Sequence, residues 1–130
     1  MTDVAVAVVV AGPLVLVGRR AADALVAAGC DEFPGGKVEP DETPAAAAVR
    51  ECQEETGILV TIAARLDVQD LAGGGPRVHF FAAAPAPGQP PPRPPFRWVP
   101  ILALEPSRFP TANGRVLGLL RRNAVDQGGS

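Results

Sequence analysis

Three glutamates with helical spacing are the residues of this sequence best placed to do chemistry. Glu51, Glu54 and Glu55 follow a run of alanines, and at about 100° per helical residue they fall within one sector of a helix. Carboxylates on one helix face repel one another, at roughly 0.2–0.5 kcal/mol for a pair four residues apart. A hard cation such as Mg²⁺ or Mn²⁺ would offset that repulsion, because it takes carboxylate oxygens together with substrate phosphates. The sector is therefore either a metal-binding face or a solvated acidic surface.

A glycine loop just before these glutamates favours the metal-binding interpretation. Gly35, Gly36 and Lys37 precede the helix. Glycine lets the backbone approach a ligand closely, and a lysine ammonium meets a phosphate as a point charge. A simple turn would also use two glycines, but it would leave the acidic face unexplained.

The acidic helix has predictable ends. Thr43 suits the N-cap, Pro44 suits the first helical position, and Gly57 suits the C-terminal stop. The side of the helix away from the glutamates should face the core through Ala45, Val49 and Cys52.

Apolar runs between turn signals predict the remaining elements. Strands are expected at residues 4–10, 14–17, 58–63, 65–68 and 78–82, with apolar structure resuming at 96–102. Residues 33–36 are expected as a loop, and residues 21–29 as either a helical turn or a loop. A last helix should carry the stripe Val116, Leu119 and Leu120 and end near Arg121 and Arg122. Interleaved strands and helices indicate the α/β or α+β class with a mixed sheet.

Prolines dominate one segment between strands. Residues 85–95 contain seven prolines, which excludes a helix or a central strand. We expect an extended surface loop that tolerates substitution, because it carries no acid and no evident ligand.

Composition limits the classes of function. The 130 residues suit one domain, residues 1–130, and a net charge of −2 without a basic run does not favour DNA, RNA or an acidic membrane as partner. The apolar run 4–17 is too short for a bilayer and is interrupted by Gly12 and Pro13. No secretory pattern is expected at the start, and Cys30 and Cys52 are expected as free thiols. We therefore expect a cytoplasmic protein.

The motif around the glutamates resembles the Nudix box of Nudix hydrolases. The matching positions, at the spacing of that box, are Gly36, Glu42, Arg50, Glu51, Cys52, Glu54, Glu55, Gly57 and Ile58. Cys52 alone departs from the family pattern, since an aliphatic residue is usual there, and a small buried thiol is compatible with that place. The resemblance implies the Nudix αβα sandwich, with a mixed β-sheet between helices.

Further segments resemble the MutT-type branch of this family, which removes oxidised nucleotides such as 8-oxo-dGTP from the nucleotide pool and so serves DNA repair. These segments are residues 19–24, 32–39 and 109–113. The likeness is weak at residues 60–77 and across the prolines. It implies a nucleoside triphosphate pyrophosphohydrolase that uses Mg²⁺ or Mn²⁺ and releases a nucleoside monophosphate and pyrophosphate.

The resemblance also implies a role for each matched residue. These are the metal ligands Glu51, Glu54 and Glu55 with a carbonyl of Gly35 or Gly36, the orienting Arg50, the phosphate contacts Lys37 and Arg20, and the base-pocket residues Phe33 and Asn113. One of the glutamates would also help to activate water. Asn113 carries both a donor and an acceptor for a purine edge, but it also suits the N-cap of the last helix, and both roles stay open.

One departure keeps alternatives open. The MutT branch carries a further glutamate in the loop before its next strand, whereas residues 85–95 hold no acid, and the nearest acids are Asp70 and Glu105. Either the three helix glutamates suffice, or another acid reaches in, or turnover is slow. The alternatives are a Nudix hydrolase of another nucleotide, such as CTP or dCTP, and a catalytically weak nucleotide-binding sensor. The chain is expected as a monomer or homodimer.

Overall fold

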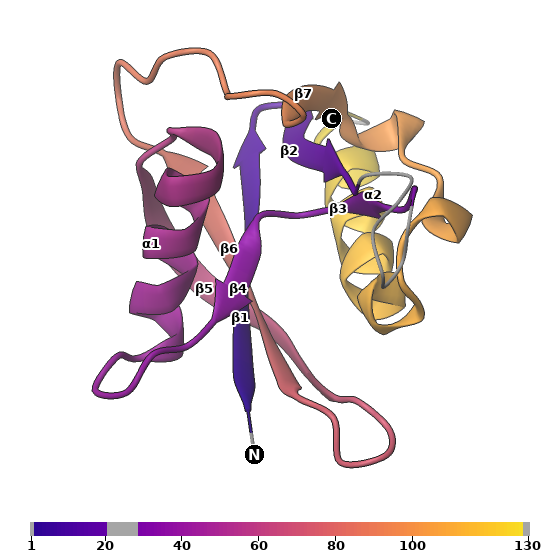
Figure 1. The fold of residues 1–130 in the computed structure, drawn as a ribbon. Coiled ribbons are helices and arrows are strands. Elements are labelled where there is room, and N and C mark those ends of the chain that lie inside the picture. Colours follow the sequence, from indigo (N-terminus) through magenta and orange to yellow (C-terminus); the bar gives the residue numbers. More distant parts are fainter. Residues whose placement is uncertain (1, 21–28, 129–130) are drawn as a thin grey trace.

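The computed structural model describes residues 2–20 and 29–128, which form a mixed β-sheet packed between helices. Figure 1 shows α1 (Pro44–Thr56) on one face of the sheet and α2 (Gly114–Gly128) on the other. The strands are β1 (Asp3–Ala11), β2 (Leu14–Arg19), β3 (Asp31–Glu32), β4 (Gly35–Lys37), β5 (Val60–Asp70), β6 (Arg77–Pro85) and β7 (Arg97–Pro100). Single-turn 3₁₀ helices are η1 (Ile101–Ala103), η2 (Pro106–Arg108) and η3 (Thr111–Asn113). The expected αβα sandwich is confirmed.

Strand β1 is the centre of the sheet. Along one edge it pairs with β6 in parallel, and β6 pairs with β5 in antiparallel orientation. Along the other edge it pairs first with β4, at residues 4–6, and then with β2, at residues 10–11. Strands β3 and β7 extend the sheet from β2. The short glycine strand β4 thus lies at an edge, beside the first half of β1.

Alternating residues of β1 build two separate cores. Ala5, Ala7 and Val9 belong to the cluster beneath α1, whereas Val8 belongs to the cluster beneath α2. The α1 side of that first cluster is also built from small residues, among them Ala47 and Ala48. Alanine facing alanine lets α1 lie close to β1, and this brings the polar side of the helix within reach of β4.

The ends of α1 are confirmed. The Thr43 hydroxyl accepts a hydrogen bond from the Ala46 N–H at 3.1 Å, and Pro44 opens the helix. Gly57 follows in the left-handed conformation, with φ 78°, and its N–H donates to the Gln53 carbonyl. Glycine suits this position because, without a Cβ, it adopts positive φ without steric strain.

Several predicted boundaries were wrong. The segment 33–36 is not all loop, because Gly35 and Gly36 are hydrogen-bonded to β1 within β4. The two strands expected at 58–63 and 65–68 form the single strand β5, which begins at Val60 and absorbs its irregularities as bulges. The proline segment starts one residue later than predicted, since Pro85 still pairs with β5.

The last helix is longer than predicted. The stripe Val116, Leu119 and Leu120 does face the sheet, with Val116 and Leu120 buried. The helix runs on to Gly128, so Arg121 and Arg122 lie inside it and do not mark its end. Of the segment 21–29, residues 21–28 lie outside the described residues.

None of the helices among residues 2–20 and 29–128 combines the length and apolar character needed to cross a membrane.

Replacement of Gly18, outside the glutamate face, is predicted to disturb this fold through packing. A Cβ at Gly18 would come within 2.7 Å of the buried Phe96 ring, whereas a Cβ at the helical Gly118 would meet nothing within 4 Å. We expect Gly18→Ala to lower the free energy of unfolding by about 1–3 kcal/mol through overpacking. The matched variant Gly118→Ala should raise it by roughly 0.5–1 kcal/mol. Urea unfolding of both variants measures this, and equal stability of the two would contradict the packing described.

Candidate active site

The glutamates of α1 meet the backbone of β4. The Gly35 N–H donates to Glu55 Oε1 at 2.8 Å, and the Glu51 carboxylate lies directly against Gly36. Glu54 is the outermost of the three, with 60% of its side chain exposed. The structure therefore brings Glu51 and Glu55 together with both glycines, and leaves Glu54 at the rim.

Only glycine fits at these two positions of β4. A Cβ at Gly36 would lie 2.5 Å from the Glu51 carboxyl carbon. A Cβ at Gly35 would run into the backbone carbonyl of Ala5. A side chain at residue 35 would push the strand away from β1, whereas one at residue 36 would displace the Glu51 carboxylate, so glycine at both positions preserves this close approach of helix and strand.

Arg50 fastens the loop before α1 to the helix. Its guanidinium donates to both oxygens of Glu42, at 2.8 and 2.9 Å, and to the Lys37 carbonyl at 3.0 Å. A fourth bond, of 2.8 Å, reaches Glu51 Oε1. The Arg50 hydrogen bonds lower the pKa of Glu42 to about 2, so this pair stays ionised. Arg50 thus contacts two helix glutamates, Glu51 and Glu54, and holds the loop that follows β4.

Glu55 has an unusual affinity for a proton. Its pKa is raised from 4.5 to about 7, mainly because burial penalises the carboxylate. The charges of Glu32, Glu51 and Glu54 raise the pKa in the same direction, whereas the bond from Gly35 lowers it. A carboxyl group with a pKa near neutrality is suited to accept and release protons.

Glu32 was missed as part of this site by the sequence analysis. It lies on β3, its charge acts on Glu55, and burial raises its own pKa against the opposing effect of Arg20. Arg20 Nη1 lies 3.4 Å from Glu32 Oε1. The only available signal was its place in the segment 32–39, because nothing in its spacing relates it to the helix glutamates.

The donor set fits a hard divalent cation. Glu51, Glu54 and Glu55 offer carboxylate oxygens beside a glycine backbone, and Cys52 is buried on the other side of the helix, where its thiol contacts Thr56. Among the described residues, no three acidic, histidine or cysteine side chains are already gathered as a closed metal cluster. Arg50 Nη1 occupies the space between Glu51 and Glu54, 2.8 and 3.3 Å from their oxygens. A cation would compete with this guanidinium for Glu51, and its positive charge would favour the ionised form of Glu55.

Phe33 and Asn113 lie on the α2 side of the sheet. The Phe33 ring is buried and lies 5.0 Å from the Phe109 ring, so the loop before β4 contacts the segment that leads to Asn113. Asn113 Nδ2 donates to the Pro110 carbonyl at 3.2 Å. That bond closes a turn and is not an N-cap, in which the side-chain oxygen would accept. Lys37 is exposed on β4, at the edge that separates the two faces.

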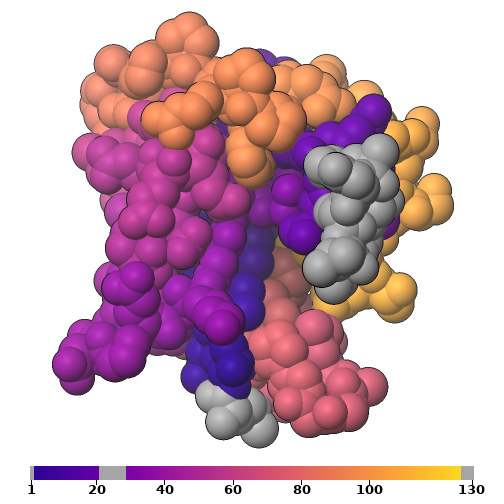
Figure 2. All heavy atoms as spheres, in the orientation of Figure 1, coloured from indigo at the N-terminus to yellow at the C-terminus, as the bar shows by residue number. Residues whose placement is uncertain are grey.

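The proline segment is fastened across the end of α1. The Arg93 N–H donates to the Thr56 carbonyl at 2.9 Å, and Arg93 Nη1 donates to the Glu54 carbonyl at 2.7 Å. The Gln89 side chain accepts from the Leu59 N–H at 2.8 Å. Figure 2 shows this segment lying directly over the end of the helix. The expectation of a freely variable surface loop therefore does not extend to Gln89 and Arg93.

Arg93 supplies a charge that α1 lacks. The last turn of α1 has no basic residue of its own and instead carries Glu54 and Glu55. Acids are unfavourable at the negative end of the helix dipole, and free carbonyls there need donors. Arg93 offsets both problems from a distant part of the chain.

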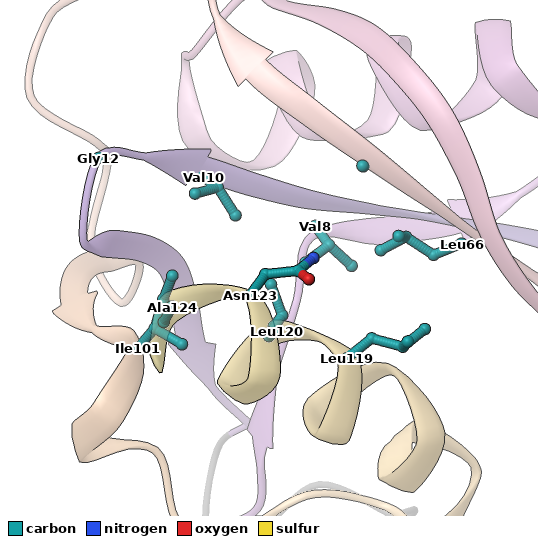
Figure 3. Close-up of a pocket in the computed structure, with 10 residues that line it drawn as sticks. Val8, Val10, Gly12, Leu66, Ile101, Leu119, Leu120, Asn123 and Ala124 are labelled. Carbon is teal, nitrogen blue, oxygen red and sulfur yellow. The ribbon is translucent and has the colours of Figure 1, made fainter. Parts of the chain in front are cut away.

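A separate cavity of about 190 Å³ lies between α2 and the sheet, near the turn at Gly12. Its lining is apolar at Val8, Val10, Leu66 and Leu120, and Figure 3 shows the Asn123 amide directed toward it. No acidic or basic side chain of the described residues lines it. Phosphoryl chemistry requires charged groups, so the candidate active site is the glutamate face of α1 with β4.

Comparison with known proteins identifies the family that this chain resembles. A family model described as NUDIX domain matches residues 1–120. The 8-oxo-dGTP diphosphatase of Escherichia coli (strain K12) is 35% identical over 113 residues, covering 83% of this chain and 86% of that protein. The CTP pyrophosphohydrolase of the same strain is 37% identical over 82 residues, covering 63% of this chain and 60% of that protein. A solved MutT structure from work on Aliivibrio salmonicida and Vibrio cholerae has a TM-score of 0.73 at 28% identity, with 92% of this chain and 94% of that chain covered.

The raised pKa of Glu55 predicts a pH dependence of stability in the metal-free protein. Between the ordinary pKa of 4.5 and the folded pKa of about 7, the folded chain holds a proton that the unfolded chain has released. Stability should therefore fall as pH rises through this window and stay lower above it. Glu55→Gln lacks this penalty, so its melting temperature should exceed that of the wild type above pH 7 and converge with it below pH 4.5. Melting curves in a chelator, with Asp126→Asn as control, measure the difference, and a pH-independent gap would refute it.

Arg93→Ala should loosen the end of α1. Losing the bond to the Glu54 carbonyl and the nearby cation should lower the free energy of unfolding by about 1 kcal/mol. Pro91→Ala changes the same loop at an exposed position and serves as control. Equal melting temperatures of the two variants would show that the loop is not fastened through Arg93.

Proposed function

Because the chain belongs to the NUDIX domain family, whose members cleave diphosphate bonds, we propose that it is a Mg²⁺-dependent pyrophosphohydrolase of nucleoside triphosphates, of the MutT type. The products would be a nucleoside monophosphate and pyrophosphate.

The observation that carries this proposal is the seating of Glu51 and Glu55 against the glycine strand. Glu55 accepts from the Gly35 N–H at 2.8 Å, and Glu51 lies against Gly36 at a distance that no side chain at residue 36 would permit. Two carboxylates gathered at a backbone, with a third at the rim, are electrostatically unfavourable without a cation. A surface helix that merely carries acids does not require glycines opposite them.

Most of these residues would hold the metal, and Arg50 and Glu55 would have further roles in the reaction. Glu51, Glu54 and Glu55, with a carbonyl of Gly35 or Gly36, would hold Mg²⁺ or Mn²⁺, which supplies charge neutralisation and alignment for attack on phosphorus. Arg50 holds Glu51 and the loop in place. Glu55 has one oxygen engaged by the Gly35 N–H at 2.8 Å, and its other oxygen would help to activate the attacking water.

Substrate contacts follow from the position of β4 at the sheet edge. Lys37 and Arg20 would contact the phosphates, with Arg20 shared between substrate and Glu32. Phe33 and Asn113, on the α2 face, would contact the base. A nucleotide would then cross the β4 edge, with its phosphates on the α1 face and its base on the α2 face.

An oxidised purine triphosphate such as 8-oxo-dGTP is the proposed substrate. The supporting fact is that the related 8-oxo-dGTP diphosphatase is matched over a larger share of both chains than the related CTP pyrophosphohydrolase. Hydrolysis of CTP or dCTP is the second candidate, because that relative is also more than one-third identical where it matches. The activity would act in the cytoplasm on the nucleotide pool and so protect DNA from incorporation of damaged precursors.

Replacing a glutamate of the site should abolish turnover and leave the fold. We expect Glu54→Gln and Glu55→Gln each to lower kcat by about 10²–10⁴-fold. Melting temperatures should not fall, because each change relieves like-charge repulsion. Pyrophosphate and phosphate release from 8-oxo-dGTP, dGTP, dATP and dCTP with Mg²⁺ measures both rate and preference, and Asp126→Asn is the control. Near-normal rates in both glutamine variants would refute the assignment.

A chelator provides the matching control on the wild type. Excess chelator should stop turnover, and Mg²⁺ or Mn²⁺ should restore it, since an oxygen-only ligand set suits these ions. Undiminished activity in chelator would exclude a metal at this site.

A further inference from the structure

Two polar side chains, Asp67 and Gln69, interrupt the apolar α2 face of the sheet. Register sets their orientation, because Asp67 lies opposite Phe80 and Gln69 lies opposite Val78 on β6. Phe80 and Val78 both belong to the core beneath α2, and directly opposed residues face the same side of a sheet. The Asp67 side chain is only 6% exposed. A carboxylate at this depth requires polar partners.

The partners present use only part of the Asp67 carboxylate. Oδ2 accepts a hydrogen bond of 2.7 Å from Gln69 Nε2, which fixes its orientation. Oδ1 lies 3.8 Å from Arg115 Nη1, beyond hydrogen-bond distance, and the Arg115 side chain is 71% exposed. Across residues 2–20 and 29–128, no donor is hydrogen-bonded to Oδ1. Since each carboxylate oxygen can accept about two bonds, Asp67 has unused capacity for a ligand.

Asp67 is connected to the glycine strand by a row of residues across the sheet. One row of register partners consists of Gly35, Val6, Phe80 and Asp67, and the next consists of Lys37, Val4, Val78 and Gln69. Three steps between strands span about 14 Å, a length of the order of an extended nucleotide. The row therefore starts at the proposed phosphate site and ends at Asp67.

The α2 face along these rows is incompletely covered. Val4 and Val6 are only half-buried there, whereas Ala5 and Ala7, on the opposite face of the same strand, are fully buried. Phe33 belongs to the same face, and Asn113 lies two residues before Arg115. The proposed base contacts and Asp67 therefore border one apolar surface.

We propose that Asp67, oriented by Gln69, accepts hydrogen bonds from the Watson–Crick edge of a guanine base lying on Val4 and Val6, and so selects guanine nucleotides. This inference rests on the proposed function, because it takes the substrate to be a nucleotide with its phosphates at β4. Guanine presents two adjacent donors, N1–H and the N2 amino group, which match a carboxylate that can only accept. Adenine and cytosine each place a ring nitrogen acceptor beside a single amino donor, and this acceptor would repel the carboxylate. Oxidation at C8 leaves the guanine donor edge unchanged, so Asp67 would distinguish the base and not its oxidation.

A purely structural role makes a different prediction. In that case Asp67 would only anchor the start of α2 through Arg115. Removing Arg115 would then have the same effect as removing the carboxylate, and base preference would not depend on either residue.

Binding of nucleoside monophosphates separates these roles without requiring catalysis. Calorimetry on the full chain, with and without Mg²⁺, would compare dGMP, dAMP and dCMP for the wild type, Asp67→Asn and Arg115→Ala. The wild type should prefer dGMP by roughly 10- to 100-fold, as expected for a bidentate contact. Asp67→Asn should lose that preference, because its amide can also pair with the acceptor and amino donor of adenine, whereas Arg115→Ala should retain the ranking. A wild type without guanine preference, or an Asp67→Asn variant that keeps it, would overturn the proposal.

Two further measurements complete the test, one with a second variant and one of triphosphate turnover. If melting curves show that Asp67→Asn does not fold, Gln69→Leu replaces it, since it leaves the carboxylate but removes its orienting bond. That variant should lose part of the dGMP preference, and an unchanged ranking would count against the proposal. Turnover of dGTP and dCTP separates the two hypotheses. A wild type that binds dGMP selectively but hydrolyses no triphosphate contradicts the proposed function alone, whereas one that hydrolyses them without any guanine preference in binding contradicts the role of Asp67 alone.

Discussion

The close approach of α1 to the first strands of the sheet is the contact on which the site depends. Small residues make it possible, with Ala47 and Ala48 on the helix and Ala5 and Ala7 on β1. At this separation the glutamates of the helix reach the backbone of β4, and only glycine fits opposite them. A larger core residue under α1 would add apolar burial but would draw the carboxylates away from the strand.

This closeness concentrates negative charge where the helix tolerates it least. Glu54 and Glu55 stand in the last turn of α1, at the negative end of its dipole, and burial raises the pKa of Glu55 to about 7. Two arginines partly compensate. Arg50 binds Glu51 from within the helix, and Arg93 caps the Glu54 carbonyl from the proline segment. A divalent cation would neutralise the remaining negative charge. The clustering of carboxylates therefore both destabilises the metal-free fold and favours metal binding.

The sheet separates two kinds of chemistry by the alternation of its strands. Residues on one face pack under α1, beside the glutamates, and residues on the other face pack under α2, where Phe33 and Asp67 lie. Strand β4 is at the edge between the faces, which suits a substrate with a charged end and an aromatic end. Tight packing under α1 fixes the charged site, while the half-buried Val4 and Val6 leave room on the opposite side.

The sequence by itself determined the features that depend on neighbouring residues. Helix α1, its cap at Thr43, its stop at Gly57 and the common sector of its glutamates all follow from spacing within one turn or two, because helical geometry is local. The family motif added the fold. Tertiary structure alone decided which distant groups meet these residues. Glu32 acts on Glu55, Arg93 caps α1 from 39 residues away, and Asp67 shares a row with Gly35, since strand register and loop path bring them together. Such contacts have no periodicity along the chain, so no local pattern could have predicted them.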